Sequence, residues 1–291
     1  MLLLTGVTGA AGSFIANEFA LHRVPVRFLV RDKAKAKHFE KSSTIEVVEG
    51  DMARPSTIAA ALKGVERVLM ISSSTPDMVE TQRAFIDASK AAGVRHVIKF
   101  SGLDARPETT FPFGLMHKVI EEYLEASGLA WTQLRPTGFM QEYLREASSI
   151  IHDGALYLAL GDAKLNPVDL ADVGKIGFAL LRDGGHEGER LAVTGPEALS
   201  MAEIAECISR AVGKPVRYVP ITPEQRRQGL ISYGIPAEIA EALDKQVKER
   251  LKGGLESKVD LATHRLFNIT PTTFAEFAQR YAGSFGRASA A

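Results

Sequence analysis

Cysteine is nearly absent from this chain, which has a single one, Cys207, among 291 residues. A lone cysteine excludes an internal disulfide and any metal site built from several cysteines. The seven histidines are scattered, with no H-x-x-x-H pair among them. We therefore expect no zinc site and no other bound metal.

An excess of charge is also missing, because 35 Lys and Arg balance 35 Asp and Glu. Without a net positive field, binding of nucleic acid or of an anionic membrane is not expected. No apolar run reaches the roughly 18 residues that would span a bilayer, and residues 1–4 are too short a run for a signal peptide. These absences make a cytoplasmic enzyme the default expectation. We separately expect a small aromatic molecule as its substrate and a monomer or homodimer as its state.

Near its start the chain has a glycine-punctuated turn between an apolar run, 2–4, and a helical pattern that begins near Ser13. The turn reads Gly6-Val7-Thr8-Gly9-Ala10-Ala11-Gly12, and a second apolar run follows at 26–30. A pyrophosphate at a helix N-terminus needs backbone N–H groups with no Cβ in the way. The spacing is one residue off the G-x-G-x-x-G fingerprint, so its place between strand and helix carries the prediction of a dinucleotide site. An ordinary strand-to-helix turn is the alternative.

The residue after the second apolar run predicts which dinucleotide binds. An NAD site usually has Asp or Glu there, about 20 residues beyond the glycines, to bind the ribose 2′-OH. Here the position holds Arg31, whose planar guanidinium suits a 2′-phosphate, although Asp32 follows at once. Lys33, Lys35 and Lys37 add positive charge. We predict NADP(H), and a solvated basic loop is the alternative.

Apolar strands alternate with helices through the first half of the chain. The expected strands are 2–4, 26–30, 45–48, 68–71, 97–100 and 131–134, and the expected helices are 13–22, 55–62, 79–92 and 115–126. Near-continuous apolar strands between helices predict a parallel sheet covered on both faces. The fold class is therefore α/β, a doubly wound Rossmann fold with its ligand at the carboxyl ends of the strands.

This alternation stops after Gly138. A helix is expected at 168–181 and a strand at 191–193, so that 168–196 returns to the sheet, and helices follow at 201–212, 236–251 and 273–281. We therefore predict an NADP(H)-binding domain over 1–138. The remainder, 139–291, is predicted to be a smaller, mainly helical lobe that covers the substrate.

Polar and small residues at strand ends are the further candidates for cofactor contact. Asp51, with Met52 beside it, could accept from the adenine amino group, or it could cap the helix that begins at Pro55. Ser72 and Ser73 could approach the cofactor, or form a plain turn. Ser101 could bind a substrate oxygen, or satisfy a neighbouring backbone group.

Several of these motifs together resemble the short-chain dehydrogenase/reductase superfamily, and more narrowly its NmrA-like atypical branch. They are the glycine turn, Gly50-Asp51, Ser101, Lys118 and Arg135-Pro136-Thr137-Gly138. That branch includes NAD(P)H quinone reductases, azoreductases, triphenylmethane-dye reductases, isoflavone-type reductases and redox-sensing regulators. The resemblance implies NADP(H) contacts from Pro136 and Phe139 and a Lys118 that binds the nicotinamide ribose. No flavin signature is seen in the sequence, so a flavin is not expected.

The chain departs from the superfamily's Tyr-x-x-x-Lys pattern, because Gly114 stands four residues before Lys118. Without a phenol, the usual ketone acid–base step lacks its proton carrier. A quinone, azo compound or cationic dye relaxes that requirement, because it accepts hydride into a conjugated system. The task left to the protein is to position nicotinamide and acceptor.

Lys118, Ser101 and His117 are the catalytic candidates. Lys118 could also be a solvent-facing lysine, and His117, which could donate a proton, could instead be structural. An apolar slot for a planar acceptor is predicted around four residues, which could equally pack one lobe on the other: Phe113, Phe139, Met140 and Tyr143.

Three functions agree with the sequence. The first is an NADPH-dependent reductase of quinones or of azo or triphenylmethane dyes. The second is a non-catalytic NADP(H) redox sensor that acts through a protein partner. The third is a reductase of one metabolite, such as an enone, imine or aryl ether, with Lys118 as its base.

Overall fold

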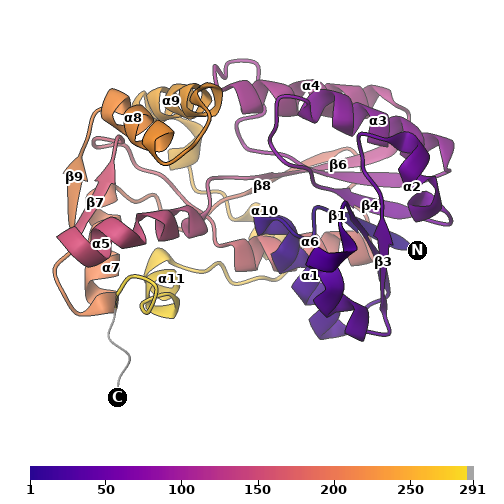
Figure 1. Ribbon diagram of the computed structural model, residues 1–291, viewed down its shortest axis with the longest axis horizontal. Helices are drawn as coiled ribbons and strands as arrows, with labels where there is room; N and C mark the ends of the chain where they lie inside the picture. The colour runs from indigo at the N-terminus through magenta and orange to yellow at the C-terminus, as the bar shows by residue number, and fades with distance from the viewer. Residues whose placement is uncertain (287–291) are drawn as a thin grey trace.

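Seven strands, all paired in parallel, form the central sheet of the computed structural model, which describes residues 1–286 (Figure 1). Their order is β3-β2-β1-β4-β5-β6-β8. The strands are β1 (Leu2–Thr5), β2 (Val26–Val30), β3 (Ile45–Glu49), β4 (Arg67–Met70), β5 (His96–Phe100), β6 (Ala130–Pro136) and β8 (Glu189–Val193). The prediction of a doubly wound α/β sheet is confirmed.

Helices cover both faces of this sheet (Figure 1). One face packs against α2 (Pro55–Leu62), α3 (Met78–Ala91) and α4 (Pro112–Ala126), and the other against α1 (Ala10–His22) and α6 (Leu170–Asp183). Successive side chains of a strand point to opposite faces. Leu3 accordingly lies in the core under α2 and α3, and Leu4 lies in the core under α1 and α6.

Some element boundaries differ from the prediction. The first helix begins at Ala10 rather than near Ser13, because the end of the glycine turn itself forms the first helical turn. Helix α4 begins at Pro112, a residue suited to a first helical position, rather than at Leu115. The basic stretch after Arg31 is ordered as η1 (Lys33–Lys41), a 3₁₀ helix capped by the Asp32 side chain.

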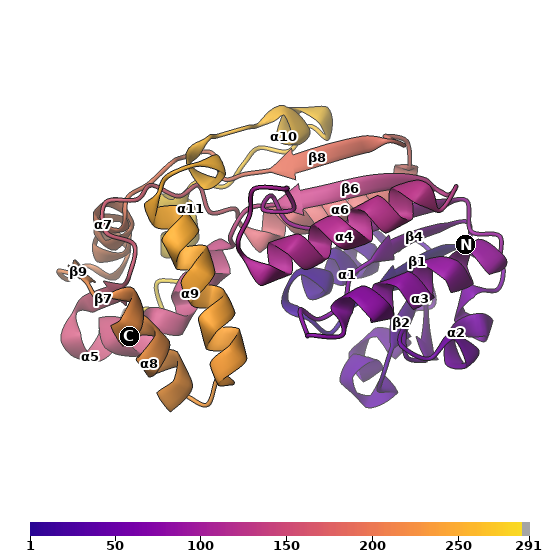
Figure 2. The same ribbon diagram turned by 90° about the horizontal axis from the view of Figure 1, so that it is seen from above.

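The C-terminal lobe has its own core and a small sheet that was not predicted. Two four-residue strands, β7 (Ala155–Leu158) and β9 (Arg217–Pro220), pair in parallel. Around them lie η2 (Met140–Glu146), α5 (Ala147–Asp153), α7 (Met201–Val212), α8 (Pro223–Ser232), α9 (Ala237–Leu251), η3 (Leu255–Ser257), α10 (Ala262–Leu266) and α11 (Phe274–Arg280). Helix α9 lies against the start of α4, and α8 lies on its far side (Figure 2). None of the helices in residues 1–286 is long and apolar enough to cross a membrane.

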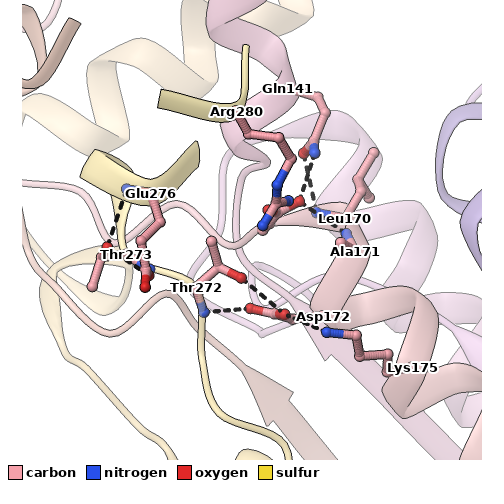
Figure 3. Close-up of polar contacts among 10 residues, drawn as sticks. Gln141, Leu170, Ala171, Asp172, Lys175, Thr272, Thr273, Glu276 and Arg280 are labelled. Carbon is pink, nitrogen blue, oxygen red and sulfur yellow. Dashed lines mark hydrogen bonds and ion pairs between the residues drawn. The ribbon is translucent and has the colours of Figure 1, made fainter. Parts of the chain in front are cut away.

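A polar joint ties the start of α6 to the C-terminal lobe (Figure 3). The fully buried Asp169 carboxylate caps α6 at Ala171 N (2.9 Å) and accepts from Gln141 Nε2 (2.7 Å) and Arg280 Nη1 (2.6 Å). One turn later Asp172 accepts from the Thr272 backbone N–H at 2.6 Å. Side chains from η2 and α11 therefore meet on one end of a sheet-covering helix.

Candidate active site

A cleft with a volume of ≈ 810 Å³ runs along the carboxyl ends of β1 to β5. It lies where a doubly wound sheet is expected to bind its ligand. The cleft brings together the following predicted site residues: Gly6, Thr8, Gly9, Ala10, Ala11, Gly12, Arg31, Asp51, Met52, Ser72, Ser73, Ser101, His117 and Phe139.

The glycine turn brings the N-terminus of α1 to this cleft. Gly6 has a φ of +68°, in the left-handed region that favours glycine. A Cβ at Gly12 would lie 2.1 Å from the Gly6 carbonyl oxygen, so only glycine fits there. The first helical turn has no side-chain cap, and its N–H groups are left to a ligand. These features fit the pyrophosphate of a dinucleotide.

The two charged residues after β2 point to different places. Arg31 is exposed and lines the cleft together with Lys35. The Asp32 carboxylate instead accepts the Ala34 N–H at 2.9 Å and caps η1, and it is not among the described residues that line the cleft. Of the charged residues that follow β2, Arg31 and Lys35 line the cleft and Asp32 does not.

The polar groups after β3 and β4 are held by local hydrogen bonds. Asp51 Oδ1 accepts from Ala53 N at 3.0 Å. Asp51 is not the cap of α2, because the residue at the cap position is Arg54, which makes no side-chain capping bond. Ser72 Oγ accepts from Gln82 Nε2 at 2.8 Å. Asp51 and Ser72 both remain in the cleft lining while making these bonds.

The far end of the cleft contains Ser101 and His117. Ser101 Oγ is buried and has no hydrogen-bond partner among the described residues. His117 Nδ1 lies 2.8 Å from Nζ of Lys99, a fully buried lysine one residue before the end of β5. Burial, with the Lys99 and Arg135 cations beside it, holds the pKa of the His117 imidazole well below its usual value. His117 is thus neutral at pH 7.

Gly114 stands where the superfamily pattern has tyrosine, and its surroundings leave no room for a side chain. A Cβ there would lie 2.7 Å from the Asp104 carbonyl oxygen and 3.2 Å from Thr109 Cγ2. The loop that joins β5 to α4 passes directly over this turn of α4. The packing of this loop therefore leaves no space for a tyrosine at position 114.

The structure does not bring Lys118 or Pro136 to the cleft lining. Lys118 Nζ pairs with Glu122 one helical turn later, at 2.5 Å, along the surface of α4. Pro136 is buried at the end of β6, in register with Val193 of β8. Lys118 directly follows His117 in α4, so the two side chains point about 100° apart around the helix axis. This accounts for the different surroundings of the two residues.

A second cavity, of ≈ 150 Å³, lies in the C-terminal lobe between η2, β7 and the α8–α9 pair. We call it the lobe cavity. Phe139 and Arg145 line both it and the cleft, and Tyr143 lines the lobe cavity only. Aliphatic side chains form part of its wall, together with several charged residues: Leu158, Leu160, Leu165, Leu230, Leu243 and Val247 are the aliphatic ones.

Two of the predicted acceptor residues line neither cavity. Met140 is 1% exposed and packs in the core of the C-terminal lobe. Phe113 packs edge-on against Phe111 and contacts Ala242 of α9, so it serves the contact between the lobes. Their apolar character alone did not distinguish core from binding surface.

Charged residues at the lobe cavity are mostly paired. Arg250 binds Glu256 at 3.0 Å and Arg226 binds Glu146 at 2.8 Å. Arg145 makes no ion pair within residues 1–286. Its position between the two cavities was not predicted, since no strand end or glycine motif marks it in the sequence.

Lys99 was also missed, although a sequence signal for it exists. A lysine inside the apolar run of a central parallel strand must be buried, since both faces of such a strand are covered. The prediction of β5 rested on the apolar residues of this run alone, so it did not identify Lys99 as a buried charge.

Comparisons with known proteins agree with this geometry. The NmrA-like family model matches residues 1–278. The chain is 36% identical to the NAD(P)H azoreductase of Xenophilus azovorans, over 99% of this chain and 100% of that one. It is 31% identical to the (4-alkanoyl-5-oxo-2,5-dihydrofuran-3-yl)methyl phosphate reductase of Streptomyces griseus, over 98% of this chain and 99% of that one.

A solved structure shares the whole architecture. The NADPH-dependent quinone oxidoreductase from Escherichia coli, in complex with NADPH, superposes with a TM-score of 0.87 and 29% sequence identity, covering 96% of this chain and 99% of that one. The match to the family model and the full-length relatives lead to the same conclusion: the chain belongs to the NmrA-like family.

Proposed function

We propose that this chain is an NADPH-dependent reductase that transfers hydride to a planar conjugated acceptor, such as a quinone or an azo compound. The observation that carries the proposal is the junction of two cavities. A cleft suited to a dinucleotide meets a partly apolar cavity in the other lobe at Phe139 and Arg145. The azoreductase and quinone oxidoreductase relatives support this choice of acceptor.

The residues of the cleft divide the work of holding the cofactor. The N–H groups of the glycine turn would bind the pyrophosphate, and Arg31 with Lys35 would bind the 2′-phosphate. Ser101 and His117 lie at the opposite end, where the nicotinamide would lie. The bound dinucleotide would supply the hydride.

The acceptor would lie between the nicotinamide end of the cleft and the lobe cavity. Phe139 offers an aromatic face at that junction, and flat conjugated molecules stack well on such a face. Holding donor and acceptor in contact is the larger part of such a catalyst's contribution. His117 is the proposed proton donor, in place of the absent tyrosine.

Two measurements test the proposal. Calorimetric titration with NADPH and NADH should give clearly tighter binding of NADPH. Stopped-flow absorbance should then show NADPH oxidation on mixing with menadione, an azo dye or malachite green. Absence of binding to either nucleotide would overturn the proposal, and NADPH binding without turnover of any acceptor would favour a redox sensor.

The range of acceptors that the protein reduces distinguishes a general reductase from a reductase of one metabolite. The furanone phosphate reductase relative favours a reductase of one metabolite as the second candidate. Comparable turnover of menadione and an azo dye would support the general reductase. Turnover of an enone alone would support the hypothesis that the protein is a reductase of one metabolite.

A further inference from the structure

His117 meets a chemical difficulty as a proton donor. A neutral imidazole that gives up its single N–H proton becomes an imidazolate, which is not accessible near neutral pH. An imidazolium would avoid this, but the pKa of His117 lies well below its usual value. The ring can therefore donate from one nitrogen only if its other nitrogen receives a proton at the same time.

Lys99 is positioned to supply that second proton. Its side chain is fully buried, and its Nζ lies 2.8 Å from His117 Nδ1 and 3.2 Å from the Phe100 carbonyl oxygen. An ammonium that donates to Nδ1 fixes the neutral ring with its proton on Nε2. Nε2 has no hydrogen-bond partner among the described residues, and the ring lines the cleft.

The surroundings of Lys99 keep its proton available. The charged groups that face Lys99 and His117 are Glu121 of α4, Arg135 of β6 and Asp104 of the β5–α4 loop. Glu121 is already held by Arg135, whose Nε donates to Oε1 at 2.9 Å. Within residues 1–286 Lys99 makes no ion pair, so its hydrogen bonds go only to Phe100 and His117.

We propose that Lys99 is a proton reservoir for the reductase, passing a proton to His117 Nδ1 as His117 Nε2 delivers its own to the acceptor. This inference rests on the proposed function and adds the source of the proton. Burial supports it, because it lowers the pKa of the Lys99 ammonium to about 7, where an ammonium gives up a proton readily.

The step balances for a quinone or an azo compound. The acceptor takes one hydride, which is two electrons and a proton, and then one proton from His117 Nε2 at the oxygen or nitrogen that carries the charge. His117 remains neutral in its other tautomer, and Lys99 changes from ammonium to amine. After the product leaves, water in the cleft returns a proton to Nε2, and Nδ1 returns its proton to Lys99.

A comparison of two acceptors provides the test. Menadione needs hydride and a proton, whereas the malachite green cation needs hydride alone, because hydride neutralises it. Lys99→Met should lower the single-turnover rate with menadione roughly 100-fold and leave the rate with malachite green within about twofold. The wild-type menadione rate should fall as pH rises through about 7, where Lys99 loses its proton, and this dependence should vanish in the variant.

Control variants isolate the role of Lys99. Lys63→Met changes an exposed lysine at the end of α2 and should leave both rates unchanged. Lys99→Gln keeps an N–H donor toward His117 but has no proton to transfer, so it should remain slow with menadione. A wild-type menadione rate in Lys99→Gln would mean that Lys99 only orients the ring, and would overturn the reservoir.

A measurement without any acceptor checks the same contact. The ¹⁵N resonances of the His117 ring, with NADP⁺ bound, should report a neutral Nε2–H tautomer in the wild type below about pH 7, where Lys99 is an ammonium. In Lys99→Met the two tautomers should mix, while the NADPH dissociation constant stays the same. An Nδ1–H ring in the wild type, or equal rate losses with both acceptors, would refute the reservoir; no turnover of any acceptor by the wild type would refute the proposed function instead.

Discussion

At the scale of single residues, the proposed preference for NADPH rests on two oppositely charged neighbours at the end of β2. Arg31 faces the cleft, and Asp32 is occupied in capping η1. The sequence alone left both possible, because a strand end does not tell which of two successive side chains turns inward. The hydrogen bond from the Ala34 N–H to the Asp32 carboxylate holds Asp32 at the start of η1, which supports the assignment of Arg31 to the cofactor.

Arg31→Ala should weaken NADPH binding by roughly 10- to 100-fold, since a charge-assisted hydrogen bond contributes about 1.5–3 kcal/mol. NADH has no 2′-phosphate, and its affinity should change less than about twofold. Calorimetric titration measures both constants. Lys33→Ala, two residues away and outside the cleft lining, is the matched control. An equal loss for both nucleotides would remove Arg31 from the 2′-phosphate site.

At the scale of secondary-structure elements, one carboxylate connects α9 to the loop before α4. Glu249 accepts from Phe111 N at 3.0 Å and from Thr109 Oγ1 at 3.0 Å, and it also binds the Thr110 N–H. The loop that excludes a side chain at Gly114 is therefore held from the C-terminal lobe. This loop is thereby tied to the helix that lines one side of the lobe cavity.

Glu249→Ala should leave NADPH affinity unchanged and raise the KM for menadione several-fold, because the wall of the lobe cavity loses its anchor. Steady-state kinetics with saturating NADPH gives the KM. Glu241→Ala, an exposed glutamate on the same helix, serves as the control. A KM equal to that of the wild type would show that the anchor does not shape the acceptor site.

The joint at the start of α6 should matter for stability rather than for chemistry. Asp169→Ala removes a helix cap, which costs about 0.5–2 kcal/mol, and takes the hydrogen-bond acceptor from Gln141 and from the half-exposed Arg280. Urea unfolding should show this loss as a lower midpoint. Asp183→Ala, at the exposed opposite end of α6, should shift the midpoint little.

Across the whole molecule, the sheet was predictable and the C-terminal lobe was only partly so. Apolar strands that alternate with helices predicted the doubly wound class, and α2 and α7 have the predicted bounds. The pair β7 and β9 escaped prediction, because each strand has four residues and Pro215 and Pro220 obscure the second one. Of the residues predicted to contact the acceptor, Phe139 and Tyr143 line a cavity, whereas Met140 packs in the core of the C-terminal lobe.

Global stability should depend on pH through His96, which is buried beside Thr132 at 2.9 Å. Burial lowers its pKa to about 4 in the folded state, from 6.5. The unfolded chain thus binds a proton between pH 6.5 and 4 that the folded chain does not. The stability from neutral His96 is complete above pH 6.5 and is lost as pH falls toward 4.

Thermal unfolding at pH 7 and pH 5 tests this dependence. The Tm of the wild type should fall more between these pH values than that of His96→Gln, by roughly 2–4 °C. His152→Gln, at an exposed position on α5, should behave as the wild type does. An identical fall in all three proteins would assign the pH dependence to other groups.

The helical pair α8–α9 supplies much of the wall of the lobe cavity and none of the wall of the cleft. Selection on residues 223–251 can consequently diversify what the protein reduces while the choice of electron donor stays constant. Replacing this segment with that of a relative should give the protein the relative's acceptor preference and leave its own nucleotide preference unchanged. One ancestral scaffold could in this way acquire many reductive specificities through a single exchangeable segment.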